Sequence, residues 1–215
     1  VRRSAMISLS NLSDDRMRHA KMGSWFNENV NRSYANNSIA FSTKPDMGTF
    51  LREWTSIYES KSGERGIFNR TAAISKAKEI GRDDSFRFGT NPCGEISLRS
   101  KQFCNLSEVV VRPNDTKASI RNKVRIATII GTYQAALTDF KYISKGWQVN
   151  TEEERLLGVS LTGIFDNPIT YNPEPSFLSK LRDHTREINK SIAQKLGIPP
   201  STAITTVKPS GTVSQ

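Results

Sequence analysis

Amphipathic helical patterns alternate with short β-branched or aliphatic runs along this chain of 215 residues. The longest helical pattern covers 117–140, and a second one, over 176–196, stops at Gly197, a residue type that ends many helices. The apolar run 156–164 has the length of a buried strand, and 203–207 is a second short run of this kind. Helices that alternate with short buried strands are typical of an α/β protein, which is the fold class we predict.

Other stretches carry weaker signals. Residues 46–60, capped by Asp46, and residues 71–80 are predicted as helices, and 96–111 as short extended segments. Thr151, followed by three glutamates, is expected to begin a further helix. Helical spacing predicts these core-facing residues: Phe50, Trp54, Ile57 and Tyr58; Ile120, Val124, Ala127, Ile130 and Leu137; Phe177, Leu181, Ile188, Ile192 and Leu196.

The chain is basic, with 31 Lys and Arg against 21 Asp and Glu and a formal net charge of +10. Such a balance favours anionic partners, including nucleotides and nucleic acid. The basic residues form no run of five or six and are not interleaved with aromatics, which weakens the alternative of a basic nucleic-acid-binding module. No direct nucleic-acid partner is therefore expected.

No apolar run approaches the roughly 20 residues that span a bilayer, so no membrane contact is expected. Two cysteines are too few for a secreted disulfide framework, which favours a cytoplasmic protein. The sequence starts without methionine and stops without an obvious ending, so we expect it to be part of a longer protein.

The segment Asn91-Pro92-Cys93-Gly94-Glu95 is the strongest candidate for chemistry. Pro92 favours an extended backbone before it, and Gly94 permits a tight turn, so Cys93 is expected at the tip of a short loop. If the segment were extended, Asn91, Cys93 and Glu95 would point roughly the same way. A thiol between an amide and a carboxylate can form a small active site, because the amide binds hydroxyls and the carboxylate accepts a proton. A partly buried, inert cysteine fits the same residues equally well.

A metal site is not predicted. Cys93 and Cys104 lie eleven positions apart without a C-x-x-C pair, which makes them poor zinc ligands. His19 and His184 are remote in sequence from both cysteines.

Three segments occur in one order and together resemble the active-site signatures of ribonucleotide reductases, in the versions of the adenosylcobalamin-dependent class (class II). They are Asn91-Pro92-Cys93-Gly94-Glu95, Gln102-Phe103-Cys104-Asn105-Leu106-Ser107-Glu108 and Lys208-Pro209-Ser210-Gly211-Thr212-Val213-Ser214. Four supporting segments also resemble that class: Val1-Arg2-Arg3-Ser4-Ala5, Ala35-Asn36-Asn37-Ser38, Gly66-Ile67-Phe68-Asn69-Arg70 and Gly158-Val159-Ser160-Leu161-Thr162-Gly163. The stretch Glu152-Glu153-Glu154-Arg155-Leu156-Leu157-Gly158-Val159-Ser160 is most similar to the monomeric branch that reduces ribonucleoside triphosphates.

The resemblance implies a role for each matching residue. Cys93 matches the cysteine that becomes a thiyl radical and abstracts the ribose 3′ hydrogen. Glu95 matches the carboxylate that takes the 3′-hydroxyl proton, and Asn91 matches the amide that orients the substrate hydroxyls. Cys104 matches one member of the redox-active pair that ends as a disulfide. Its partner is expected outside these 215 residues, so we expect the chain by itself not to turn over.

The same resemblance implies that Pro209, Ser210, Gly211 and Thr212 bind the substrate phosphate, as a glycine-containing turn can do with its N–H groups and hydroxyls. It also implies a ten-stranded α/β barrel with a central, cysteine-bearing finger loop, of which residues 1–215 are one partial catalytic domain.

The implied reaction is the reduction of ribonucleotides to 2′-deoxyribonucleotides for DNA synthesis. The implied cofactor is adenosylcobalamin, and the implied partners are a ribonucleotide substrate, deoxynucleotide or ATP effectors and a thioredoxin-type reductant. The alternative within the family is the large subunit of an iron-dependent (class I) enzyme, which receives its radical through a tyrosine relay.

Overall fold

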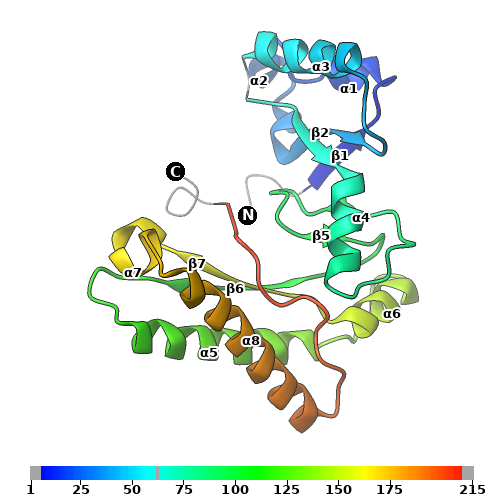
Figure 1. Ribbon diagram of the computed structural model, residues 1–215. Coiled ribbons are helices and arrows are strands. Elements are labelled where there is room, and N and C mark those ends of the chain that lie inside the picture. The colour runs from blue at the N-terminus through cyan, green and yellow to red at the C-terminus, as the bar shows by residue number, and fades with distance from the viewer. Residues whose placement is uncertain (1–5, 62, 210–215) are drawn as a thin grey trace. The chain divides into compact units, whose positions relative to one another are not determined.

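A computed structural model describes residues 6–61 and 63–209, and the chain divides into two compact units between Ser100 and Lys101 (Figure 1). Helices and short strands alternate in both units, which confirms the predicted mixture of helix and strand. Among the described residues, no helix is long and apolar enough to cross a membrane.

The first unit is built on a parallel three-stranded sheet in the order β1-β2-β3. Ile39 on the central strand is fully buried. A short antiparallel hairpin, β4 with β5, completes the unit. The elements are β1 (Met6–Ser10), α1 (Asp15–His19), α2 (Trp25–Glu28), the 3-10 helix η1 (Val30–Tyr34), β2 (Ala35–Phe41), α3 (Met47–Ser60), β3 (Gly66–Asn69), α4 (Arg70–Glu79), β4 (Gly89–Thr90) and β5 (Ser97–Leu98).

Helix α3 begins where it was predicted, because the Asp46 side chain accepts a hydrogen bond from the Thr49 amide at 2.9 Å. The face it buries was predicted wrongly. Trp54 and Tyr58 are exposed, and the buried residue of α3 is Glu53, which is 1% exposed. Glu53 forms ion pairs with Arg18 and Arg65, so a charge network replaces the expected apolar stripe.

The second unit pairs β6 with β7 in parallel, and α5 packs against both strands and against α8. Residues 203–207, predicted as a strand, contribute a single parallel bridge between Thr205 and Val159 of β7. The elements are β6 (Asn105–Val110), α5 (Lys117–Ala135), α6 (Lys145–Glu154), β7 (Leu157–Thr162), the 3-10 helix η2 (Ile164–Asp166), α7 (Pro168–Tyr171) and α8 (Pro175–Leu196).

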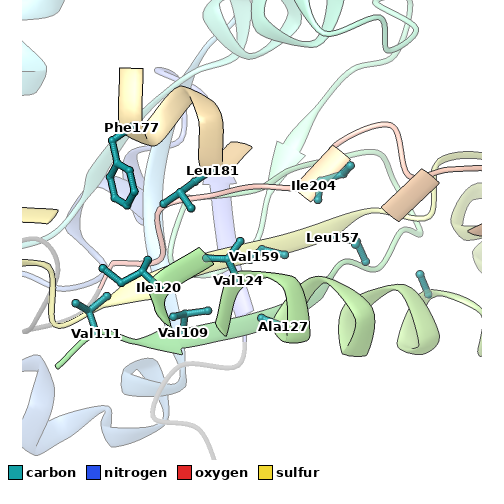
Figure 2. Packing of buried hydrophobic residues seen from close by; sticks show 11 residues of the cluster. Val109, Val111, Ile120, Val124, Ala127, Leu157, Val159, Phe177, Leu181 and Ile204 are labelled. Atoms are coloured by element: carbon teal, nitrogen blue, oxygen red, sulfur yellow. The ribbon is translucent and has the colours of Figure 1, made fainter. Parts of the chain in front are cut away.

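The core of the second unit lies between these strands and helices (Figure 2). Residues from β6, β7, α5, α8 and the segment after α8 meet there: Val109, Val111, Ile120, Val124, Ala127, Ala135, Leu157, Val159, Phe177, Leu181 and Ile204. Helix α8 ends as predicted, with Gly197 in the left-handed conformation at φ 67°.

Two helical predictions in this unit are wrong. Ile130 and Leu137, expected in the core, are 52% and 74% exposed. Gly131 lies against Leu157 instead, because the buried face of α5 passes through its small residues. Thr151 does not begin a helix, since α6 starts at Lys145 and ends at Glu154.

Candidate active site: the Cys93 loop

Cys93 lies at the tip of the hairpin formed by β4 and β5, in which Gly89 pairs with Leu98 and Thr90 with Ser97. We call residues 91–96 the Cys93 loop. The side chain of Cys93 is exposed and its thiol is free. The sequence-based expectation of a cysteine at the tip of a short loop is thus confirmed.

A tight turn shapes the first half of the Cys93 loop. The Gly94 amide donates to the Asn91 carbonyl oxygen at 3.0 Å. Gly94 has a φ of 85°, a conformation that glycine adopts without steric cost. Pro92 therefore occupies the second turn position, where its ring fixes a suitable φ.

This turn corrects one expectation. The segment is not extended from Asn91 to Glu95, so alternation of side chains along a strand does not apply to it. Asn91 is buried, Cys93 is exposed and Glu95 is half-buried. The condition for a common direction, an extended segment, is therefore not met, because a turn with Gly94 at positive φ interrupts it.

Asn91 closes the base of the Cys93 loop. Its Oδ1 accepts hydrogen bonds from the Ile96 amide at 3.0 Å and from Thr90 Oγ1 at 3.3 Å. The main-chain N–H of Asn91 donates to the Ile96 carbonyl oxygen at 3.3 Å. The side-chain oxygen of Asn91 thus stabilises the conformation of the loop. The Nδ2 group is the part of this side-chain amide that can donate a hydrogen bond to a substrate.

Two buried arginines support the strands of the hairpin. Arg70, the first residue of α4, donates from Nε to the Phe88 carbonyl oxygen at 2.9 Å. Arg82 donates from Nη1 to the Ser97 carbonyl oxygen at 2.9 Å and lies over the ring of Phe88 at 4.7 Å. Burial, and then the charge of Arg87, lower the pKa of Arg70 from its ordinary value.

The sequence reasoning missed both arginines, because neither belongs to the motif around Cys93. Charged residues are rarely buried unless they are paired, so only contacts distant in sequence distinguish these two from the many exposed arginines of the chain. A third missed residue is Asn36 on β2, whose Nδ2 donates to the Pro92 carbonyl oxygen.

Cys104 belongs to the second unit, immediately before β6, is half-buried and forms no disulfide within the described residues. Its neighbours are firmly held. Phe103 packs against Phe140 and Trp147, with ring centroids 5.0 Å and 4.6 Å away. The Gln102 amide donates to Glu154 of α6 at 2.5 Å.

The predicted phosphate-binding turn is described only at Pro209. Ser210, Gly211 and Thr212 lie outside the described residues. The segment leading to them is tied to β7, since the Lys208 amide donates to Ser160 Oγ at 3.1 Å and the Thr206 amide donates to the Val159 carbonyl oxygen at 3.1 Å.

Within residues 6–61 and 63–209, no group of three or more His, Cys, Asp or Glu side chains is arranged to hold a metal ion. The Cys93 loop itself offers an exposed thiol, with a carboxylate two positions away.

Curated relatives align with most or all of the chain. A protein from Lacticaseibacillus paracasei named adenosylcobalamin-dependent ribonucleoside-triphosphate reductase is 30% identical over an alignment of 252 residues, which covers 100% of this chain and 32% of that protein. A protein of the same name from Lactobacillus leichmannii is 28% identical over 223 residues, covering 84% of this chain and 28% of its own length. The chain thus spans about a third of the length of the curated relatives it matches.

Solved structures share its fold. A B12-dependent (class II) ribonucleotide reductase matches with a TM-score of 0.66 at 22% identity, over 97% of this chain and 32% of that one. The alpha subunit of a class Id ribonucleotide reductase from Actinobacillus ureae matches with a TM-score of 0.59 at 14% identity, over 94% of this chain and 45% of that one. No protein-family model matches the chain.

Proposed function

We propose that this chain, which is homologous over its whole length to part of the adenosylcobalamin-dependent ribonucleoside-triphosphate reductases, carries the radical-bearing cysteine of such an enzyme. The observation that carries the proposal is the exposed thiol of Cys93 at the tip of a hairpin that buried arginines support. The reaction is the reduction of a ribonucleotide, with a triphosphate as the favoured substrate, to the 2′-deoxyribonucleotide.

Adenosylcobalamin is the cofactor that the names of the relatives indicate. When bound, it supplies the radical chemistry that removes the hydrogen atom from the Cys93 thiol. The exposure of Cys93 fits this requirement, since a thiol at a loop tip is accessible to a group outside its own unit. A thiol suits the step because its S–H bond is weak enough to be cleaved and its radical is reactive enough toward a sugar C–H bond.

Each residue of the Cys93 loop has a separate role in the reaction. The Cys93 sulfur radical takes the hydrogen atom from C3′, which forms an S–H bond and breaks a C–H bond. Glu95 accepts the 3′-hydroxyl proton, and the 2′-hydroxyl takes a proton from a thiol of the redox-active pair and leaves as water. Asn91 orients the substrate hydroxyls through Nδ2, because its Oδ1 already accepts from Ile96 and Thr90.

Cys104 supplies the reducing equivalents. With a partner cysteine it gives up two electrons and two protons and becomes a disulfide, and a thioredoxin-type protein restores the pair. The turn Pro209-Ser210-Gly211-Thr212 holds the substrate phosphate through the backbone N–H groups that follow Pro209 and through the hydroxyls of Ser210 and Thr212. Deoxynucleotides or ATP act as effectors, and the location is cytoplasmic, where free thiols persist.

We also propose that residues 1–215 form part of a ten-stranded α/β barrel with the Cys93 loop at its centre. The described pairs β1–β2, β2–β3 and β6–β7 are parallel, a pairing that is typical of α/β barrels. A central position would shield the radical from water.

A class I large subunit is the second candidate, favoured by the likeness to the class Id alpha subunit. To separate the two, the full-length protein is supplied with a ribonucleoside triphosphate, a dithiol reductant and either adenosylcobalamin or a dimetal radical subunit. We expect deoxynucleotide with adenosylcobalamin alone. Product that depends on the dimetal subunit would support class I. Absence of product in both, together with salt-sensitive binding to DNA or RNA, would favour a nucleic-acid-binding module.

A further inference from the structure

Asn36 joins the sheet of the first unit to the tip of the Cys93 loop. It lies near the start of β2, in register with Ile7 of β1, and is half-buried. Its Nδ2 donates to the carbonyl oxygen of Pro92, 56 positions along the chain. Asn36 therefore contacts the peptide unit directly before Cys93.

The acceptor of this bond is significant because the Pro92 carbonyl belongs to the peptide unit that leads into Cys93. The hydrogen bond that defines the turn joins its first and last residues, Asn91 and Gly94. This bond does not restrain the central peptide, between Pro92 and Cys93, which could rotate. Rotation of that peptide converts a type I turn into a type II turn and reorients the side chain of the third residue, which here is Cys93.

The backbone of Cys93 agrees with the unrotated form. Among the described residues, the non-glycine positions with positive φ are Lys61, Lys101 and Arg155, so Cys93 keeps a negative φ. The rotated turn would require a positive φ at Cys93, which is unfavourable for a residue with a side chain. The Asn36 hydrogen bond adds to this preference and selects one orientation of the thiol.

We propose that Asn36 is a positioning residue for the Cys93 thiol, acting through the Pro92 carbonyl. Arg70 and Arg82 hold the strands of the hairpin, whereas Asn36 holds the central peptide of the turn. In the proposed function the thiol must approach a ribose hydrogen atom within a narrow range of geometry, so a misplaced thiol should lower kcat. The kinetic test of this inference therefore rests on the proposed function.

The test uses Asn36→Asp in the full-length protein. The new side chain has nearly the same shape, but its carboxylate cannot donate to the Pro92 carbonyl. We expect kcat to fall by about tenfold or more while KM stays within about twofold, because positioning acts on the chemical step. As the pH falls and the carboxyl becomes protonated, it can donate again, so the ratio of variant to wild-type kcat should rise toward one.

A second readout does not depend on catalysis. The alkylation rate constant of each thiol by iodoacetamide is measured by peptide mass analysis in the absence of cofactor. We expect Asn36→Asp to change the rate at Cys93 by about threefold or more, with Cys104 unchanged as the internal reference. The matched control is Asn122→Asp on α5, where the exposed Asn122 side chain accepts a hydrogen bond from Arg125 of the same helix, and both rates should equal the wild type.

The outcomes are distinguishable. An active wild type with unaltered kcat and unaltered Cys93 alkylation in Asn36→Asp would overturn the role of Asn36 and leave the proposed function intact. An inactive wild type would overturn the proposed function, and the alkylation rates would still decide whether Asn36 orients the thiol. A loss of kcat that is the same at every pH, with equal changes at Cys93 and Cys104, would indicate general destabilisation and contradict the inference.

Discussion

The guanidinium of Arg82 donates a hydrogen bond to the main-chain carbonyl oxygen of Ser97 at 2.9 Å. Arg82 is buried, and Ser97 belongs to β5, the strand that leaves the Cys93 loop. This contact ties the segment that follows α4 to one strand of the hairpin. The position of the proposed radical cysteine therefore depends on a residue eleven positions before it and outside its motif.

Replacement of that arginine should weaken both the fold and the chemistry. We expect Arg82→Leu to lower the free energy of unfolding by about 2 kcal/mol, because the half-buried Ser97 carbonyl loses the hydrogen bond from Arg82. Urea unfolding of the full-length protein measures the change. Arg87→Leu, on the exposed part of the same segment, should lie within about 0.5 kcal/mol of the wild type. Equal losses in the two variants would contradict a specific role for the Arg82 contact.

Cys93→Ser tests the central assignment. A hydroxyl has a much stronger bond to hydrogen than a thiol, so the variant should form no deoxynucleotide. Its affinity for the ribonucleotide should stay within about threefold of the wild type, because the exposed side chain changes little in size. Product assay and calorimetric titration give the two quantities. Normal turnover in Cys93→Ser would refute the assignment.

Cys104→Ser should separate hydrogen abstraction from reduction. Under the proposed function, the Cys93 radical should still form and remove the 3′ hydrogen, whereas the reducing pair would be incomplete. We therefore expect loss of label from 3′-tritiated nucleotide and release of free base in place of deoxynucleotide. If the variant instead makes deoxynucleotide at the wild-type rate, Cys104 is not part of the redox pair.

Glu95→Gln removes the proposed proton acceptor and preserves the shape of the side chain. We expect kcat to fall by about a hundredfold with little change in KM, since general base catalysis contributes a factor of this order. Glu79→Gln, at an exposed position of α4, is the matched control and should match the wild type. A KM effect without a kcat effect would assign Glu95 to substrate binding.

Asp115 gives the stability of the second unit a pH dependence. Hydrogen bonds from Lys123 at 2.6 Å and Ser119 at 2.7 Å lower the pKa of Asp115 from 3.8 to about 2. A lowered folded-state pKa stabilises the fold fully above the unfolded value and loses this contribution as the pH falls through the folded value. The difference in unfolding free energy between wild type and Asp115→Asn should therefore shrink as the pH falls from about 4 to about 2.

Urea unfolding of both proteins across this pH range measures that difference, with Asp139→Asn, at an exposed position, as the control. A difference that does not vary with pH would contradict this explanation.

The sequence by itself determined the features that depend on local chemistry. Gly94 permits the turn, Asp46 caps α3 and Gly197 ends α8, and each of these effects acts over a few residues. The order of the motifs was also readable without coordinates, and the relatives confirm the family resemblance drawn from it. The class of fold followed from the alternation of helices with short strands.

Only the tertiary structure decided which faces are buried and which side chains hold the Cys93 loop. Helical spacing marked Trp54 and Ile130 as core residues, yet each is exposed, because the partner surface is not encoded in the periodicity of one helix. Asn36 and Arg82 reach the hairpin from elsewhere in the chain, through bonds to main-chain carbonyls that any sequence would offer. Such bonds require two distant segments to be brought together, and that depends on the packing of the whole unit.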